Sequence, residues 1–286
     1  MKNQSLPSID VTDNVQITSA ISEERFDRYI YPHRFENGCF LIVVQGEAKV
    51  TINILDYDIK QNDVITLVPG TIIQIKKYSK DLLLKTIAFS ADFVKEIGIV
   101  KNSLPHLMYV RNNPILSISE TEASLLIEAY SSFSKILNYL GENNIKDEMV
   151  VKSMLMSFLY CLIAIYELNI DLNDIPPLSR SKEITKEFQS LILRYYKEER
   201  SVGFYAGKLF ISPKYLSDVI KNTTGKSSTD FISEAVLLDA KVQLKSTIRT
   251  IQEIADSLNF PNQSFFAKYF KKHVGLSPKA YRESSM

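Results

Sequence analysis

The side chains best suited to chemistry lie near the C-terminal end of this 286-residue sequence, in a short helical pattern that begins after Asn262. One face of the pattern is apolar, and the opposite face carries amide, hydroxyl and ammonium groups. Groups of this kind can bond the base edges and phosphates of a DNA groove. We expect bases to be read by Gln263, Ser264, Ala267 and Lys268, and phosphates to be contacted by Lys271 and Lys272.

A second set of the same kind comes earlier, after the pair Ser212-Pro213. Lysine suits guanine, glutamine suits adenine, and a carboxylate can accept a bond from the amine of cytosine. On this basis Lys268 and Gln263 are candidates for guanine and adenine, and Asp218 for cytosine. The first set is expected to read bases through Lys214, Ser217 and Asp218, and to contact phosphates through Lys221 and Lys226.

Two short helical patterns joined by a turn surround each set, which is the helix-turn-helix arrangement. In the second unit, residues 251–258 have one apolar face, residues 259–262 break the pattern, and a new apolar face follows. The order recurs, with one extra residue in the second turn, which indicates two similar units. Ser212 and Asn262 can cap the helices that follow them. The matching pairs are Ala206 and Ala255, Leu209 and Leu258, Leu216 and Phe266, Val219 and Tyr269, Ile220 and Phe270, Gly225 and Gly275, and Phe231 and Tyr281.

The segment from about Ser181 to Arg282 resembles the DNA-binding domain of the AraC/XylS family of transcription regulators. The residues that carry the resemblance include Ala206, Leu209, Ser212-Pro213, Tyr215-Leu216, Gly225-Lys226-Ser227, Ala240-Lys241, Ile254-Ala255, Phe260, Gln263-Ser264, Phe266, Phe270-Lys271-Lys272, Gly275, Ser277-Pro278 and Tyr281-Arg282. The chain departs from the family pattern at Gly207, Asp218 and Val236, which bears on the bases that are read.

The resemblance implies a sequence-specific DNA-binding regulator that is not an enzyme. Its partners would be double-stranded operator DNA, RNA polymerase, a second copy of the chain and a small-molecule effector. The two recognition helices would enter successive major grooves about 34 Å apart. A helix over residues 232–246 would set that spacing.

The net charge of +1 conceals an asymmetry. Residues 179–286 hold 18 Lys and Arg against 11 Asp and Glu, a net +7, whereas residues 1–178 hold 16 against 22, a net −6. A basic C-terminal part fits a domain that meets phosphates. The polar N-terminus lacks the apolar segment of a signal peptide. Two distant cysteines, Cys39 and Cys161, suit a reduced cytoplasmic protein.

From Val15 to about Ile87 the sequence shows short apolar runs at strand spacing, separated by Gly46, Asn62-Asp63 and Pro69-Gly70. Such spacing predicts a small barrel or jelly roll. The order resembles the cupin-like effector domain of AraC-type regulators. We therefore expect an α+β chain: an N-terminal cupin-like β-barrel with flanking helices and a C-terminal all-α domain with two helix-turn-helix units. Residues 1 to about 14 are expected to be poorly ordered, and strands are expected at 40–44, 48–54, 64–68, 71–75 and 82–89.

The histidines argue against a metal-dependent cupin enzyme. Such enzymes carry a His-x-His pair and a later His, whereas this chain has His33, His106 and His273. We therefore expect no metal and no cofactor. The alternative is a cupin-type enzyme or small-molecule-binding protein with an accessory DNA-binding domain.

Residues 117–168 predict two helices with wide apolar faces, which pack on the barrel, join two subunits, or do both, since the second helix is apolar on most of its circumference. The most apolar stretch, 149–168, is interrupted by Lys152 and is expected to be too short for a membrane span. The domains are predicted as 1–168 for effector binding and dimerisation, 169–180 for the linker, and 181–286 for DNA binding, beginning with a helix over 181–199.

Overall fold

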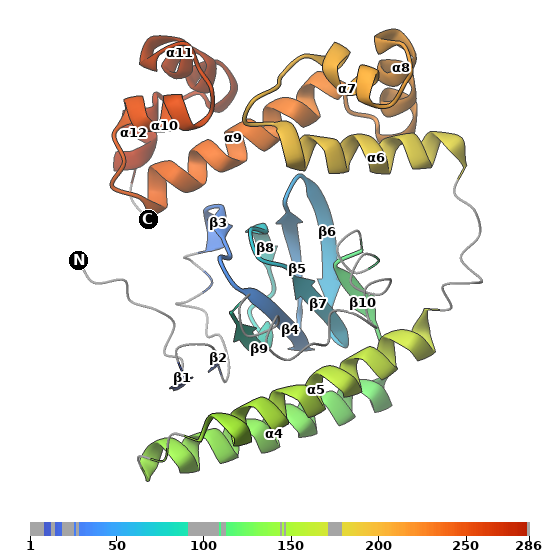
Figure 1. Cartoon of the computed structure of the whole chain (residues 1–286), viewed down its shortest axis with the longest axis vertical. Coiled ribbons are helices and arrows are strands. Elements are labelled where there is room, and N and C mark those ends of the chain that lie inside the picture. The colour runs from blue at the N-terminus through green and yellow to red at the C-terminus, as the bar shows by residue number, and fades with distance from the viewer. Residues whose placement is uncertain are drawn as a thin grey trace.

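The computed structural model describes residues 9–12, 15–18, 26, 29–90, 109, 113–143, 145, 147–170 and 179–284. Antiparallel strands form the N-terminal half, a pair of long helices lies on one side of them, and the helical C-terminal half lies on the other side (Figure 1). The α+β fold class predicted from the sequence is therefore confirmed.

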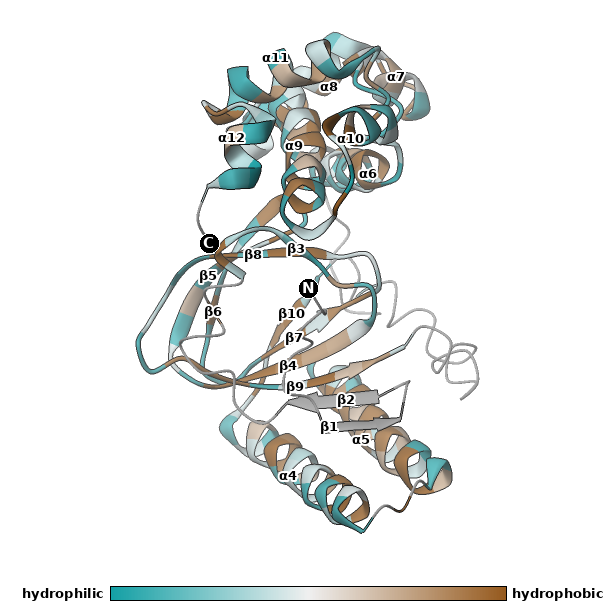
Figure 2. Ribbon diagram, turned by 90° about the vertical axis from the view of Figure 1, so that its left-hand side faces the viewer, coloured by the Kyte–Doolittle hydropathy of each residue, from teal (hydrophilic) through white to brown (hydrophobic). Residues whose placement is uncertain are grey.

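The strands form two sheets that face each other across an apolar interior (Figure 2). In the first sheet the order is β1 (Ile9–Thr12), β2 (Val15–Thr18), β9 (Leu83–Phe89), β4 (Gly38–Gln45), β7 (Asp63–Leu67) and β10 (Ile115–Ser117). In the second sheet it is β3 (His33–Arg34), β8 (Ile72–Tyr78), β5 (Glu47–Ile52) and β6 (Leu55–Lys60).

Strand β4 shows why one run of the sequence is apolar without alternation. Successive side chains of a strand point to opposite faces of the sheet. Cys39, Leu41 and Val43 face the interior between the sheets, whereas Phe40 and Ile42 pack against the helices outside. Both faces are therefore buried, and each position from Cys39 to Val43 is apolar.

The two outer helices are α4 (Glu120–Glu142) and α5 (Glu148–Asn169). Ser119 and Glu122 form a capping box at the start of α4, and Asp147 caps α5 through its carboxylate. The inner faces of both helices share one core with the first sheet. This observation supports the first of the two roles considered for the pair, which is packing on the barrel.

Seven helices make up the C-terminal half as far as it is described. They are α6 (Arg180–Tyr195), α7 (Val202–Lys208), α8 (Pro213–Thr224), α9 (Ser228–Ser246), α10 (Ile251–Ser257), α11 (Gln263–Val274) and α12 (Pro278–Glu283). One apolar core joins them, and Ile54 from the turn between β5 and β6 enters that core. The barrel is thus packed against the helical half.

Some predicted boundaries were wrong. Strand β1 lies within the stretch expected to be poorly ordered, because its backbone pairs with β2, with Ile9 opposite Ile17. Strand β6 was missed although its sequence, LDYDIK, alternates apolar and polar residues as a half-buried strand does, and it pairs with β5. Helix α9 starts at Ser228 rather than 232, since Ser227 and Asp230 form a capping box. Helix α6 ends four residues before the predicted 199.

The prediction that residues 149–168 are too short to span a membrane was also wrong. Among the described residues, Glu148–Asn169 is the one helix long and apolar enough to cross a membrane by length and composition. Val151, Leu155, Phe158 and Leu162 on its inner face are buried in the core shared with α4 and the first sheet. The helix therefore has the surroundings of a core helix.

Residues 171–178, most of the predicted linker, lie outside the described part, so the domain boundaries stay a prediction.

Candidate nucleic-acid interface

The two candidate recognition helices, α8 and α11, start and end in the same way. Ser212 caps α8 by accepting a bond from the N–H of Tyr215, and Asn262 caps α11 by accepting bonds from the N–H groups of Ser264 and Phe265. Each helix ends at a glycine with positive φ, 76° at Gly225 and 85° at Gly275. The left-handed conformation favours glycine because it has no Cβ.

An offset of 50 residues relates the caps, the ends and the buried faces of the two helices. The apolar faces face inward: Leu216, Val219 and Ile220 on α8, and Phe266 and Phe270 on α11, with Tyr269 half-buried. Both views of the molecule place α8 and α11 on the side of the helical half away from the barrel (Figures 1 and 2). The opposite, polar faces are therefore directed away from the rest of the chain.

Most of the predicted base-reading residues are accessible on those faces. Lys214, Asp218, Gln263, Ser264 and Lys268 are exposed, and Ser217 and Ala267 are half-buried at the edges. The structure thus brings each set of side chains onto one accessible face. The base that each side chain reads stays a prediction.

The four lysines predicted to contact phosphates differ in whether their ammonium groups are already bound to other groups of the chain. Lys271 and Lys272 are exposed in the last turn of α11. The ammonium of Lys221 donates to the carbonyl oxygen of Gly225 at 3.0 Å and so neutralises the end of α8. Lys226 is bound to Glu234, with 2.9 Å between Nζ and Oε1. Of the four lysines, Lys226 is therefore the weakest candidate for a phosphate, since that contact competes with Glu234.

Exposed aromatic side chains at the third position of both recognition helices are a feature that the sequence reasoning did not use. Tyr215 on α8 is 46% exposed and Phe265 on α11 is 61% exposed. The exposure of Phe265 excludes a place in the core. The repeat offset of 50 residues would have paired it with Tyr215. Such rings have an apolar face for sugars and thymine methyl groups.

Helix α9 joins the two units and carries a buried carboxylate, Asp239, whose side chain is 2% exposed. Its Oδ1 accepts a bond from Arg34 of β3 at 2.7 Å, and its Oδ2 accepts one from the Tyr196 hydroxyl at 2.6 Å. Lys197 lies 3.6 Å from Oδ2. Burial acts to raise the pKa of Asp239, but Tyr196, Arg34 and Lys197 outweigh it and hold that pKa below the usual value.

From Asp239 the hydrogen bonds continue into the second unit. Gln243 donates to Asp239 at 3.4 Å and accepts from Arg249 at 3.2 Å and from Ser257 of α10 at 3.0 Å. A barrel residue, the helix between the units and the second unit are therefore linked by side chains. Sequence reasoning missed Asp239 and Arg34 because nothing in the pattern of either segment pairs them across 205 positions.

Two helix-turn-helix units on one connecting helix, beside a cupin-like barrel, define the class of this protein. Family models match both halves: one described as an AraC-like ligand binding domain over residues 17–159, and one described as a helix-turn-helix domain over residues 205–284. The first of these models matches half of the chain. The chain belongs to the AraC family.

Individual relatives agree with this placement. The Msm operon regulatory protein of Streptococcus mutans is 23% identical over 253 residues, which cover 87% of this chain and 84% of that protein. The uncharacterized regulator YobQ of Bacillus subtilis is 35% identical over 72 residues, 25% of this chain and 30% of YobQ. The chain spans less than a third of the length of YobQ and 13% of that of a second B. subtilis regulator, YtdP.

Among solved structures, ToxT of Vibrio cholerae aligns over 94% of this chain and 98% of its own, with 14% identity and a TM-score of 0.40.

Proposed function

We propose that this chain is a sequence-specific, DNA-binding transcription regulator of the AraC type. The observation that carries the proposal is the pair of recognition helices, capped alike, spaced by one connecting helix and exposed on the side away from the barrel. The basic C-terminal half supplies the attraction to phosphates, which is independent of sequence. The accessible polar side chains of α8 and α11 supply the base contacts.

The length of α9 supports the binding of two successive major grooves by one chain. A 19-residue helix such as α9 is about 28 Å long, close to the 34 Å of one DNA turn that separates successive major grooves. We propose that α8 and α11 enter successive grooves on one side of the duplex. Lys214, Ser217, Asp218, Gln263, Ser264, Ala267 and Lys268 then read bases, and Lys221, Lys226, Lys271 and Lys272 hold phosphates.

The same proposal includes the other partners. The chain acts in the cytoplasm as a homodimer, is controlled by a small molecule and touches RNA polymerase when it regulates. Msm of S. mutans, by its name, regulates an operon, which supports the regulatory role. A cupin-type enzyme is not favoured, because the family models that match describe a ligand binding domain and a helix-turn-helix domain.

Selection from random double-stranded DNA tests the function. Purified chain should enrich a site with two short conserved blocks about 10 base pairs apart, centre to centre. Gln263→Ala should weaken one block, whereas Lys182→Ala, an exposed position on α6 outside α8 and α11, should leave the motif unchanged. Recovery of unrelated sequences, with no motif after repeated rounds, would contradict sequence-specific binding.

A further inference from the structure

A cavity lies between the barrel and the helical half. Its volume is about 520 Å³, within the range of sites for small organic ligands, about 300–1,000 Å³. The interior of the barrel, lined by Phe26, Tyr29 and Phe35 among others, has only about 30 Å³ left, the room of one water molecule. The described side chains therefore leave room for a ligand at the domain interface and little room inside the barrel.

The walls of this interdomain cavity carry charge of one sign. Four cations line it, and among the described lining residues there is no Asp or Glu: the cations are Arg34, Lys186, Arg194 and Lys197. Arg34 and Lys197 also contact Asp239. Within the described part of the chain, Lys186 and Arg194 make no ion pair, so their charges are available to a ligand.

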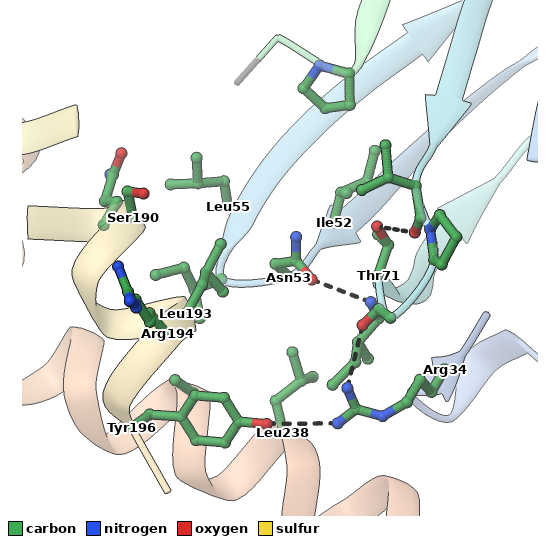
Figure 3. Close-up of a pocket in the computed structure, with 18 of the residues that line it drawn as sticks. Arg34, Ile52, Asn53, Leu55, Thr71, Ser190, Leu193, Arg194, Tyr196 and Leu238 are labelled. Carbon is green, nitrogen blue, oxygen red and sulfur yellow. Dashed lines mark hydrogen bonds between the residues drawn. The ribbon is translucent and has the colours of Figure 1, made fainter. Parts of the chain in front are cut away.

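The remaining walls are apolar or neutral. Ile52 and Leu55 come from the barrel, and Leu193 and Leu238 come from α6 and α9. Figure 3 shows Ser190, Leu193 and Arg194 of α6 on one side of the space and Leu55, Ile52 and Thr71 on the other. A neutral body would pack on the leucines and isoleucine, while an anionic group would meet the cations.

We propose that the interdomain cavity binds a small organic anion, a carboxylate or phosphate on a partly apolar body, with its charge held by Lys186 and Arg194. Guanidinium groups bind carboxylates and phosphates through paired hydrogen bonds. As the place of the regulatory effector, this site rests on the proposed function, but binding itself can be measured without DNA.

The position of the cavity makes a bound anion sensitive to how the two halves dock. Its walls come from both, and two of its residues, Arg34 and Tyr196, also hold Asp239 on the helix between the units. A ligand that binds one docked arrangement better than another shifts the balance between them. If the ligand changes operator affinity by some factor, the operator changes ligand affinity by the same factor.

The test uses the full chain and a fluorescent organic anion, 8-anilinonaphthalene-1-sulfonate. The expected result is saturable binding at one site per chain. N-phenyl-1-naphthylamine, which has the same rings without the sulfonate, should bind at least tenfold more weakly. Glucose 6-phosphate and octanoate are then added as competitors, and the one that displaces the dye shows whether the natural ligand is closer to a phosphate ester or to a carboxylate.

Variants assign the site to the cavity. Lys186→Glu and Arg194→Glu should each weaken dye binding at least tenfold. Lys182→Glu is the matched control, because it makes the same charge change one turn away on α6, outside the lining, and should stay within twofold. Circular dichroism checks folding, and Lys186→Gln and Arg194→Gln replace any variant that does not fold.

Three results would overturn the proposal: no saturable dye binding, equal binding of the uncharged analogue, or equal binding by the cavity variants and Lys182→Glu. Failure of both competitors to displace the dye would overturn the ligand class. Operator binding by the same proteins without dye is measured separately. Loss of dye binding in Arg194→Glu with intact operator binding separates this site from the DNA-binding function, and a chain that binds dye but no operator would refute only the proposed function.

Discussion

Among single residues, Lys268 and Lys272 lie on the same recognition helix, but Lys268 is expected to read a base and Lys272 to contact a phosphate. Lys268 projects from the face opposite Phe266 and Phe270, and Lys272 is in the last turn of the helix. Lys268→Ala should cost about 1–3 kcal/mol on the best operator and relax preference at one base position. Lys272→Ala should weaken all sequences alike and lower the slope of log affinity against log salt by about one unit.

Titrations of both variants on operators with single base changes, at several salt concentrations, measure the difference. Uniform loss of affinity in both would make Lys268 a phosphate contact and would mean that α11 sits in the groove at a different rotation.

Asp239 is the residue on which the docking of the two halves is expected to depend. Asp239→Asn keeps the shape but removes the charge that faces Arg34 and Lys197. It should lower the free energy of unfolding at pH 7 by on the order of 2 kcal/mol, the scale of hydrogen bonds to charged groups. Urea unfolding followed by circular dichroism measures this, with the exposed Asp58→Asn as the control that should change little.

The carboxylate of Asp239 should also make the free energy of unfolding depend on pH. Its folded-state pKa is held below the ordinary aspartate value of 3.8, despite the opposing effect of burial, by Tyr196, Arg34 and Lys197. The stability it contributes is therefore present above about pH 4 and is lost as the pH falls through the lower folded-state pKa. The difference between the wild type and Asp239→Asn should shrink below pH 4. A constant difference from pH 6 to pH 3 would exclude this role.

At the scale of elements, the glycines at helix ends and in helix interiors should respond in opposite directions. Gly275 ends α11 with φ of 85°, a conformation that side chains disfavour, so Gly275→Ala should destabilise the chain by about 1 kcal/mol. Gly207 lies inside α7 with nothing within 4 Å of an added Cβ, so Gly207→Ala should stabilise it by about 0.5–1 kcal/mol. Melting curves of the pair decide the matter, and shifts of the same sign would contradict the argument.

Helix α5 is expected to join two subunits through its outer face. Tyr160 is 57% exposed, Met149 and Leu168 are exposed, and no charged residue occurs from Ser153 to Tyr166. An exposed apolar stripe of this kind marks an interaction surface. Tyr160→Glu should convert a dimer of the 32.6 kDa chain to a monomer that keeps its circular dichroism.

Sedimentation measures the mass of both forms. Lys49→Glu, on the second sheet away from α5, is the control that should remain dimeric. A wild-type chain that sediments as a monomer at micromolar concentration would remove this basis for a dimer.

At the scale of the whole molecule, the helical half is expected to fold and read DNA by itself. A fragment from Ser179 retains the core of α6–α12 and the Tyr196 and Lys197 contacts of Asp239, but loses Ile54 and Arg34 from the barrel. It should bind the same operator as the full chain, more weakly if dimerisation adds avidity. Titration against operator and random DNA tests this. A helical fragment with no preference for the operator would place specificity elsewhere.

The sequence was informative wherever structure depends on neighbours along the chain. The caps at Ser212 and Asn262 and the matching glycines at the ends of the recognition helices were readable because a cap needs only a few consecutive residues. Strand β6 and the start of α9 were not read. The first carries the alternation of a half-buried strand and was overlooked, and the second begins at a capping box that carries Asp where the sequence pattern expects Glu or Gln.

By itself, the sequence determined the doubled helix-turn-helix, the barrel before it and the polar faces of α8 and α11, because periodicity and capping are local. Only the tertiary structure decided that Arg34 meets Asp239, that Lys226 is engaged by Glu234, and that four cations surround one cavity between the halves. Arg34 and Asp239 are 205 positions apart, and the walls of the cavity come from both halves, so these arrangements exist only once the two halves pack together.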